Sequence, residues 1–158
     1  LELLGLPAIG DADGRSLVPL CAGARQPDRS GVYTVFNSNH AGSDYCMRAV
    51  HNARYAYIYN GWVENGRKTY QMENMAGLSW KAMLDQAKTD EVLARRTALY
   101  LQRPLEEFYD YDRDPGALVN LAADPASADL IRQMRQQMRT VMTATQDPEL
   151  RRFTRLVA

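Results

Sequence analysis

Three side chains of this sequence are candidates for binding a ligand: His40, Arg48 and Trp80. His40 lies in a polar loop, where its imidazole could hydrogen-bond a ligand or could be an ordinary surface histidine. Arg48 carries a planar guanidinium that suits an anion, but it could equally pair with an acid of the fold such as Asp44 or Glu107. Trp80 offers an apolar ring on which a sugar could stack, or the ring packs in the interior.

Acidic residues gather in one short stretch, which raises the question of a cation site: Glu106, Glu107, Asp110, Asp112 and Asp114. Because side chains alternate along a strand, these carboxylates fall on both faces of a predicted strand and its turn. We therefore expect a solvated surface here rather than a metal site. The two cysteines, Cys21 and Cys46, are too few for a disulfide framework and lie outside metal-ligand spacing.

The elements that must position these residues begin with four strands. Alternation and β-favouring residues predict strands over residues 32–36, 47–50, 54–59 and 107–111. The third strand shows the period of two most clearly, because Tyr55, Tyr57 and Tyr59 share one face. Between the third and fourth strands, the sequence predicts a helical segment over residues 76–88 and a second helix capped by Thr89.

The best predicted helix follows the last strand. Asp124 is a good N-cap, and Pro125 suits the first helical position. Apolar residues then recur at three- and four-residue steps: Leu130, Ile131, Met134, Met138, Val141 and Met142. Asp147 and Pro148 end this helix before a short basic helix. We therefore expect an α+β fold: a small four-stranded antiparallel sheet with a long C-terminal helix packed across it, plus a helical insertion.

Several motifs, taken in order, resemble the C-terminal region of the sulfatase family. They lie at residues 3–7 and 13–20, at residues 44–50, at residues 74–80 (Asn-Met-Ala-Gly-Leu-Ser-Trp) and at residues 106–121. The middle two look most like the branch that contains heparan N-sulfatase. The resemblance implies the C-terminal subdomain of an alkaline-phosphatase-like sulfatase, which is a four-stranded antiparallel sheet with a helix against it. It also implies a division of the chain into the end of the catalytic domain with a connector (1–30) and the subdomain itself (31–158).

The same resemblance implies that the chemistry of the reaction belongs to a partner, the large N-terminal sulfatase domain. In the family, that domain supplies the calcium ligands and a formylglycine made from a Cys/Ser-x-Pro-x-Arg motif. Cys21 and Arg25 have the required separation, but Gly23 stands where the motif requires Pro. We therefore expect Cys21 to be a half-buried structural thiol, and we predict no catalytic residue, metal ligand or cofactor site in this chain. Cys46 replaces a Pro that relatives carry before Met-Arg.

The function that follows is the C-terminal portion of a sulfuric-ester or sulfamate hydrolase, which helps to form the substrate cleft and is inactive alone. Sulfated glycans are the expected substrates, while aryl sulfates and N-sulfated glucosamine stay open. In the family, the region around His40 leans over that cleft. The alternative is a stand-alone carbohydrate-binding or interaction domain. A broad exposed apolar patch along the first residues and the sheet edge would favour the first hypothesis.

Composition sets a few outer limits. Nineteen Lys and Arg balance nineteen Asp and Glu among 158 residues, so no overall field favours nucleic acid as a partner. No apolar run is long enough to predict a membrane span. Residues 1–5 end in glycine and are typical of the last turn of a helix, so we expect a portion of a longer protein. The resemblance is compatible with a periplasmic or secreted location, and the cysteines leave the compartment open, the cytoplasm included.

Overall fold

The computed structural model describes residues 1–7, 9–12, 14–27, 31–40, 42, 44–63 and 69–157. The chain forms two compact units, Leu1–Ser30 and Gly31–Ala158. The first unit contains the 3-10 helix η1 (Glu2–Leu4) and the short helix α1 (Val18–Cys21). Gly5 ends η1 with φ 66°, a left-handed conformation that glycine adopts without steric cost.

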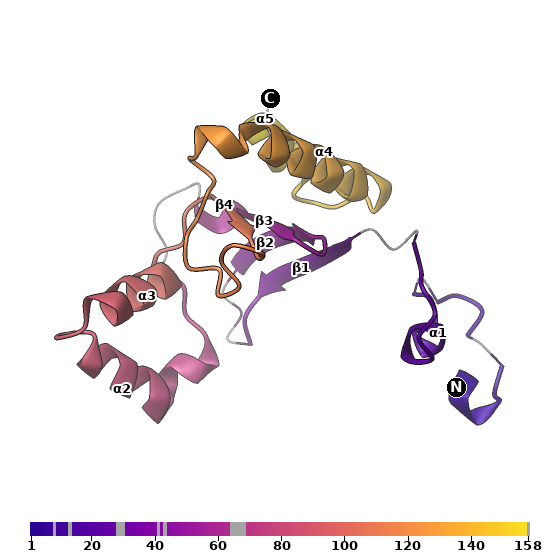
Figure 1. Ribbon diagram of the computed structural model, residues 1–158, viewed down its shortest axis with the longest axis horizontal. Coiled ribbons are helices and arrows are strands. Elements are labelled where there is room, and N and C mark those ends of the chain that lie inside the picture. The colour runs from indigo at the N-terminus through magenta and orange to yellow at the C-terminus, as the bar shows by residue number, and fades with distance from the viewer. Residues whose placement is uncertain are drawn as a thin grey trace. The chain divides into compact units, whose positions relative to one another are not determined.

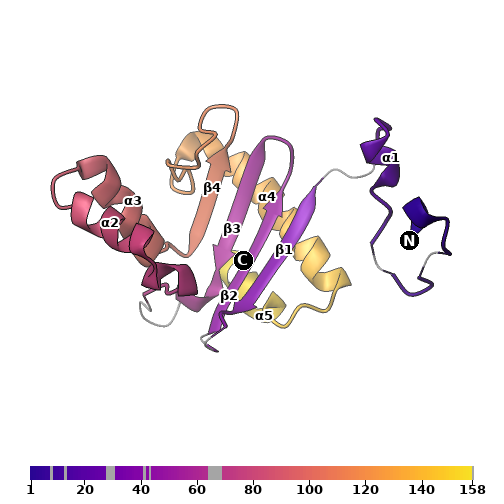
Figure 2. The ribbon, with the colours of Figure 1, turned by 90° about the horizontal axis from the view of Figure 1, so that it is seen from below.

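The second unit is built on a four-stranded sheet in the order β1-β2-β3-β4, as the views in Figures 1 and 2 show. The strands are β1 (Val32–Ser38), β2 (Asp44–His51), β3 (Tyr55–Asn60) and β4 (Glu106–Asp110). Every neighbouring pair is antiparallel. The predicted four-stranded antiparallel sheet is therefore confirmed, with strand ends that differ from the prediction by at most three residues.

Helices account for most of the remaining chain. They are η2 (Gly61–Val63), η3 (Glu73–Ala76), α2 (Leu78–Gln86), α3 (Glu91–Leu101), η4 (Pro125–Ser127), α4 (Ala128–Ala144) and α5 (Leu150–Val157). The predicted cap of α3 was wrong by one residue. The Asp90 carboxylate accepts the N–H groups of Val92 and Leu93, whereas the Thr89 hydroxyl donates back to the Gln86 carbonyl. Asp90 immediately precedes the first helical residue, which is where a side chain reaches the free N–H groups.

The hydrophobic core lies between the sheet and the helices α4 and α5, which cover one face of it (Figures 1 and 2). The sheet contributes Val50, Tyr57, Tyr59 and Phe108, and the helices contribute Ile131, Met134, Met138, Met142 and Phe153. Each fully buried side chain of this size stabilises the fold by about 1.5 to 3 kcal/mol before entropy is counted. The predicted packing of the long helix across the sheet is confirmed.

The helices α2 and α3 form a hairpin that lies beside β4 and away from α4 (Figure 2). The residues that lead into this hairpin are tied to its end, because the Tyr70 N–H donates to the Leu101 carbonyl at 2.9 Å. Within the part of the chain that the structure describes, no helix is both long and apolar enough to cross a membrane.

Candidate functional site

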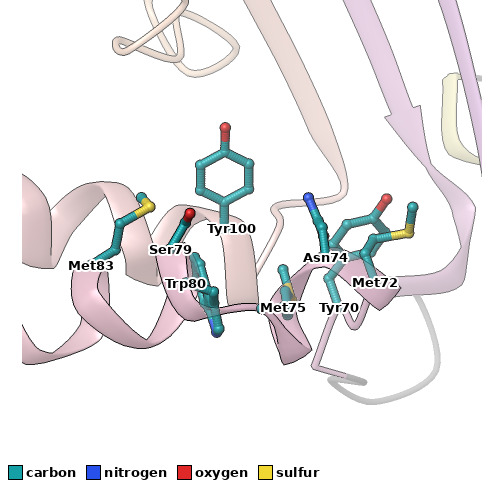
Figure 3. Close-up of a pocket in the computed structure, with 9 residues that line it drawn as sticks. Tyr70, Met72, Asn74, Met75, Ser79, Trp80, Met83 and Tyr100 are labelled. Atoms are coloured by element: carbon teal, nitrogen blue, oxygen red, sulfur yellow. The ribbon is translucent and has the colours of Figure 1, made fainter.

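A cavity of about 530 Å³ opens where η3 and α2 meet α3 (Figure 3). Aromatic rings, methionines and small polar groups make its walls: Tyr70, Met72, Asn74, Met75, Gly77, Ser79, Trp80, Met83 and Tyr100. Among the described residues that line it, none carries a charge. We call this cavity the Trp80 pocket. Its walls offer apolar ring faces together with polar groups that can hydrogen-bond a ligand, namely the Asn74 amide and the hydroxyls of Ser79, Tyr70 and Tyr100.

Trp80 is placed in the pocket by α2. The helix begins directly after Gly77, and Ser79 and Met83, four residues apart, lie on the same side of it. Across the pocket, Trp80 meets Tyr100 of α3 edge to face, with ring centroids 6.1 Å apart. The Trp80 ring is only partly buried. The structure thus leaves part of this ring exposed while its other contacts include the Tyr100 ring, and a role of Trp80 in binding stays a prediction.

The opposite wall of the pocket rests on an aromatic cluster. Tyr70 lies 4.9 Å from the ring of Tyr45 and 5.8 Å from the ring of Trp62. The Tyr45 hydroxyl accepts the Gln71 N–H at 3.0 Å, which ties the segment to β2. Burial raises the pKa of the Tyr70 hydroxyl above its ordinary value. Trp62 is itself buried in this cluster, so it supports the wall and has no face free for a sugar.

His40 lies in the exposed loop between β1 and β2, close to the chain that enters the pocket. Its backbone N–H donates to the Glu73 carboxylate at 2.9 Å, and the Asn39 side chain donates to the Gln71 carbonyl at 3.1 Å. These two bonds hold the loop against Gln71 and against Glu73, the first residue of η3. The structure therefore brings the loop of His40 near the Trp80 pocket, although the imidazole does not line it.

Arg48 lies elsewhere, under the helices on the core face of the sheet. Its side chain is 1% exposed and makes two bonds to Asp147, at 2.7 and 3.1 Å. The Tyr33 hydroxyl donates to the same carboxylate at 2.9 Å. Burial by itself would raise the pKa of Asp147, but the bonds from Arg48, from the Glu149 N–H and from Tyr33 hold that pKa below its ordinary value. An incoming anion has no exposed edge of this guanidinium to bind.

This placement corrects the expected role of Arg48 as a substrate ligand. The alternative of a structural ion pair holds, but the expected partners, Asp44 and Glu107, were wrong. The true partner, Asp147, is 99 residues away in the sequence. No local pattern marks that pairing, since it depends on how the turn between α4 and α5 reaches β2.

The acidic stretch is also more buried than its composition suggested. Glu107 is 0% exposed and accepts bonds from the Asn60 amide and the Tyr109 hydroxyl, both at 2.6 Å. Glu106 forms a bidentate pair with Arg135. Asp110 is also buried and forms such a pair with Arg54. The expected solvated surface was therefore wrong for Glu106, Glu107 and Asp110, because local spacing does not reveal these distant partners.

The two cysteines, Cys21 and Cys46, differ in exposure and in their surroundings. Cys21 is exposed rather than half-buried, which corrects the expectation for it. Gly23 adopts φ 83°, a conformation closed to proline, so the backbone here differs from that of a Cys-x-Pro-x-Arg motif. Cys46 is half-buried in β2, and burial together with the nearby Glu149 carboxylate raises the pKa of its thiol.

Two solved sulfatase structures have a similar fold. A 2-O GAG sulfatase matches 95% of this chain with a TM-score of 0.59 and 21% identity, using 24% of its own length. A candidate sulfatase from Bacteroides thetaiotaomicron VPI-5482 matches with a TM-score of 0.58, the same identity and the same coverage. No protein-family model matches the sequence, and no curated protein matches it. The chain spans about a quarter of the length of these structures, and it has the fold of that part of a sulfatase.

Proposed function

We propose that this chain is the C-terminal subdomain of a sulfatase acting on sulfated glycans, and that the Trp80 pocket completes the substrate cleft. The observation that carries the proposal is the fold match to sulfatases over 95% of the chain. The motifs at residues 44–50 and 74–80 support a finer proposal, which is that the sulfatase belongs to the sulfamidase-like branch, whose substrates carry N-sulfated glucosamine. Activity and substrate belong to the whole protein, of which this chain would be one part.

Under this proposal the chain binds and orients substrate, while its partner domain performs the chemistry. Formylglycine and calcium do not fit the residues present. The segment at Cys21 has glycine in place of the required proline, in a conformation that proline cannot adopt. Among the described residues, no three His, Cys, Asp or Glu side chains come together as a metal site requires. We therefore assign no bond-breaking step to this chain.

The chemistry of the Trp80 pocket suits the ring of a sugar better than its sulfate. Aromatic faces such as those of Trp80 and Tyr100 can pack against the C–H face of a sugar, and Asn74 and Ser79 can bond its hydroxyls. A sulfate would need a cation, and none lines the pocket among the described residues. His40, held nearby by its loop, is the proposed contact for the charged group at the edge of the pocket.

Exposed apolar residues favour the subdomain over a stand-alone binding domain. In the first unit, the large apolar side chains at the start of the chain are all at least half exposed: Leu1, Leu3, Leu4, Leu6 and Ile9. In the second unit, Val32 and Val35 are exposed on the edge strand β1. Apolar surface of this kind is typical of a face that meets another domain.

The binding part of the proposal is tested by titrating the 158-residue chain with sulfated oligosaccharides of defined length and following ligand-observed NMR. We expect Trp80→Ala to weaken binding about tenfold, because the stacking surface is lost. Leu78→Ala is the matched control, since Leu78 lies on the same helix, is exposed and does not line the pocket. Equal binding by the two variants would rule out the pocket as the sugar site.

A second experiment tests the proposal that this chain does not perform the chemistry itself. The chain alone should not hydrolyse an aryl sulfate, and Cys21→Ala should change nothing. Turnover by the chain that is lost in Cys21→Ala would contradict the proposal. An antibody against α4, used on cells that make the protein, distinguishes the two hypotheses by mass. A species several times larger than 17.9 kDa supports the subdomain, and one of that mass supports the stand-alone domain.

A further inference from the structure

Positive charge gathers in the last two helices although the chain as a whole is neutral. Residues 128–157 contain six arginines but only three acidic residues. Two of these acids are already engaged, because Asp147 pairs with Arg48 and Glu149 pairs with Arg152. The third, Asp129, lies in the first turn of α4. The rest of α4 therefore presents arginines without acidic neighbours on the same helix.

Two shallow hollows lie along α4 and adjoin each other. One, of about 470 Å³, is lined by Arg132, Gln133, Arg135, Gln136, Arg139 and Val157. The other, of about 570 Å³, is lined by Gln136, Arg139, Thr140, Thr143 and Ala144. They share Gln136 and Arg139, so together they form one surface, which we call the α4 groove. Among the described residues that line the α4 groove, none is acidic or aromatic.

The spacing of the polar residues makes the α4 groove a continuous stripe. Arg132, Gln136, Arg139 and Thr143 follow one another at steps of four, three and four residues, which places them on one side of the helix. At 1.5 Å per residue, the stripe is about 17 Å long. A ligand that fits it is extended and offers negative groups at more than one point.

The two arginines of the stripe, Arg132 and Arg139, are exposed and can bind such a ligand. Arg139 is exposed, and its side chain has no hydrogen bond or ion pair within the described residues. Within the described part of the chain, Arg132 pairs only with Asp129, and both side chains are largely exposed, so the pair contributes little and is easily exchanged. Arg135 differs, because Glu106 holds its guanidinium with bonds of 2.8 and 2.6 Å. Arg135 therefore lines the groove with its guanidinium already engaged.

We propose that the α4 groove binds a chain of sulfated polysaccharide at a second site, which shares no residue with the Trp80 pocket. Guanidinium groups match sulfate oxygens in pairs, and the side chains of Gln133, Gln136 and Thr140 can bond sugar hydroxyls. Single-stranded nucleic acid is a poorer fit, since the bases find no aromatic ring to stack on in the described lining. The site would hold a long substrate on the protein between cleavage events. This role, unlike the binding itself, rests on the proposed function.

The test measures binding of the 158-residue chain to dextran sulfate at several salt concentrations. We expect Arg132→Gln/Arg139→Gln to weaken binding about tenfold and to make its salt dependence shallower, because fewer counterions are released. The matched control is Lys88→Gln/Arg95→Gln, which removes the same charge from side chains that are 73% and 72% exposed. Equal melting temperatures show that all variants are folded.

The outcomes separate this site from the Trp80 pocket. Unchanged binding of dextran sulfate by Trp80→Ala, with loss only in the Arg132/Arg139 variant, supports the α4 groove. Equal loss in the two double variants would mean diffuse attraction by net charge and would overturn the site. The proposal is also overturned if the wild-type chain does not bind dextran sulfate, or if it binds single-stranded DNA or uncharged dextran as tightly.

Discussion

The two sides of the second unit are built in different ways. On one side, α4 and α5 press a continuous set of apolar residues into the sheet, and the buried pair of Arg48 and Asp147 joins the strands to the turn between these helices. On the other side, the α2–α3 hairpin leaves Leu78 88% exposed and leaves the Trp80 pocket open. No residue of α2, all of which are described, is fully buried.

Most of the buried apolar side chains lie between the sheet and the helices α4 and α5, whereas the hairpin leaves a pocket open. A helix with regular apolar spacing is held in place because its apolar face is buried against the sheet. The hairpin lacks such spacing, and its two helices meet through contacts such as that between Trp80 and Tyr100. The open walls of the Trp80 pocket suit contact with a ligand or with another domain. The predictions below test this difference, beginning with the largest effect.

The core side should lose the most from truncation of a single buried ring. Phe153 is fully buried between Tyr57 and Tyr59, so Phe153→Ala leaves a cavity and should lower the free energy of unfolding by about 3 to 5 kcal/mol. Leu78→Ala on the hairpin should change it by less than about 0.5 kcal/mol. Urea denaturation of both variants measures the difference. Comparable losses would mean that the two sides are equally packed.

Breaking the buried ion pair should cost nearly as much. Asp147→Ala leaves the guanidinium of Arg48 buried without its partner, and we expect a loss of about 3 kcal/mol in the same urea experiment. Asp129→Ala removes an exposed partner of Arg132 and is the control, with an expected change below about 1 kcal/mol. A small effect of Asp147→Ala would show that water reaches Arg48.

The same pair predicts a pH dependence of stability. The pKa of Asp147 in the folded chain lies below its ordinary value of 3.8, so its contribution is present above that value and is lost as pH falls through the lowered pKa. The gap in unfolding free energy between wild type and Asp147→Asn should therefore be largest near neutrality and should narrow below about pH 4. Urea titrations from neutral to acidic pH measure it. A gap that stays constant would contradict the assignment.

The smallest expected effect concerns thiol reactivity. Cys21 is exposed, whereas Cys46 is half-buried with a raised pKa, so less of it is thiolate at mildly alkaline pH. We expect a maleimide or iodoacetamide to modify Cys21 at least about tenfold faster, as followed by mass spectrometry. Cys21→Ala and Cys46→Ala assign the two rates. Equal rates would mean that the packing around β2 does not protect the Cys46 thiol from the reagent.

Sequence reasoning located the architecture better than the site. The tyrosines of β3 and the methionines of α4 repeat at the periods of a strand and a helix, so their faces could be identified before the partners were known. Trp80 was found because its ring type is distinctive. Tyr70 and Tyr100 were missed, because they lie ten residues before and twenty residues after Trp80 and share no motif with it.

By itself, then, the sequence determined the four strands, the long amphipathic helix and the order in which they follow one another. Only the tertiary structure decided that Arg48 meets Asp147 and that Glu107 is buried with Asn60 and Tyr109. The physical reason is the distance in sequence between the residues that interact. Periodicity is a local property of neighbouring residues, whereas the burial and charge partners of a side chain are set by segments that only folding brings together.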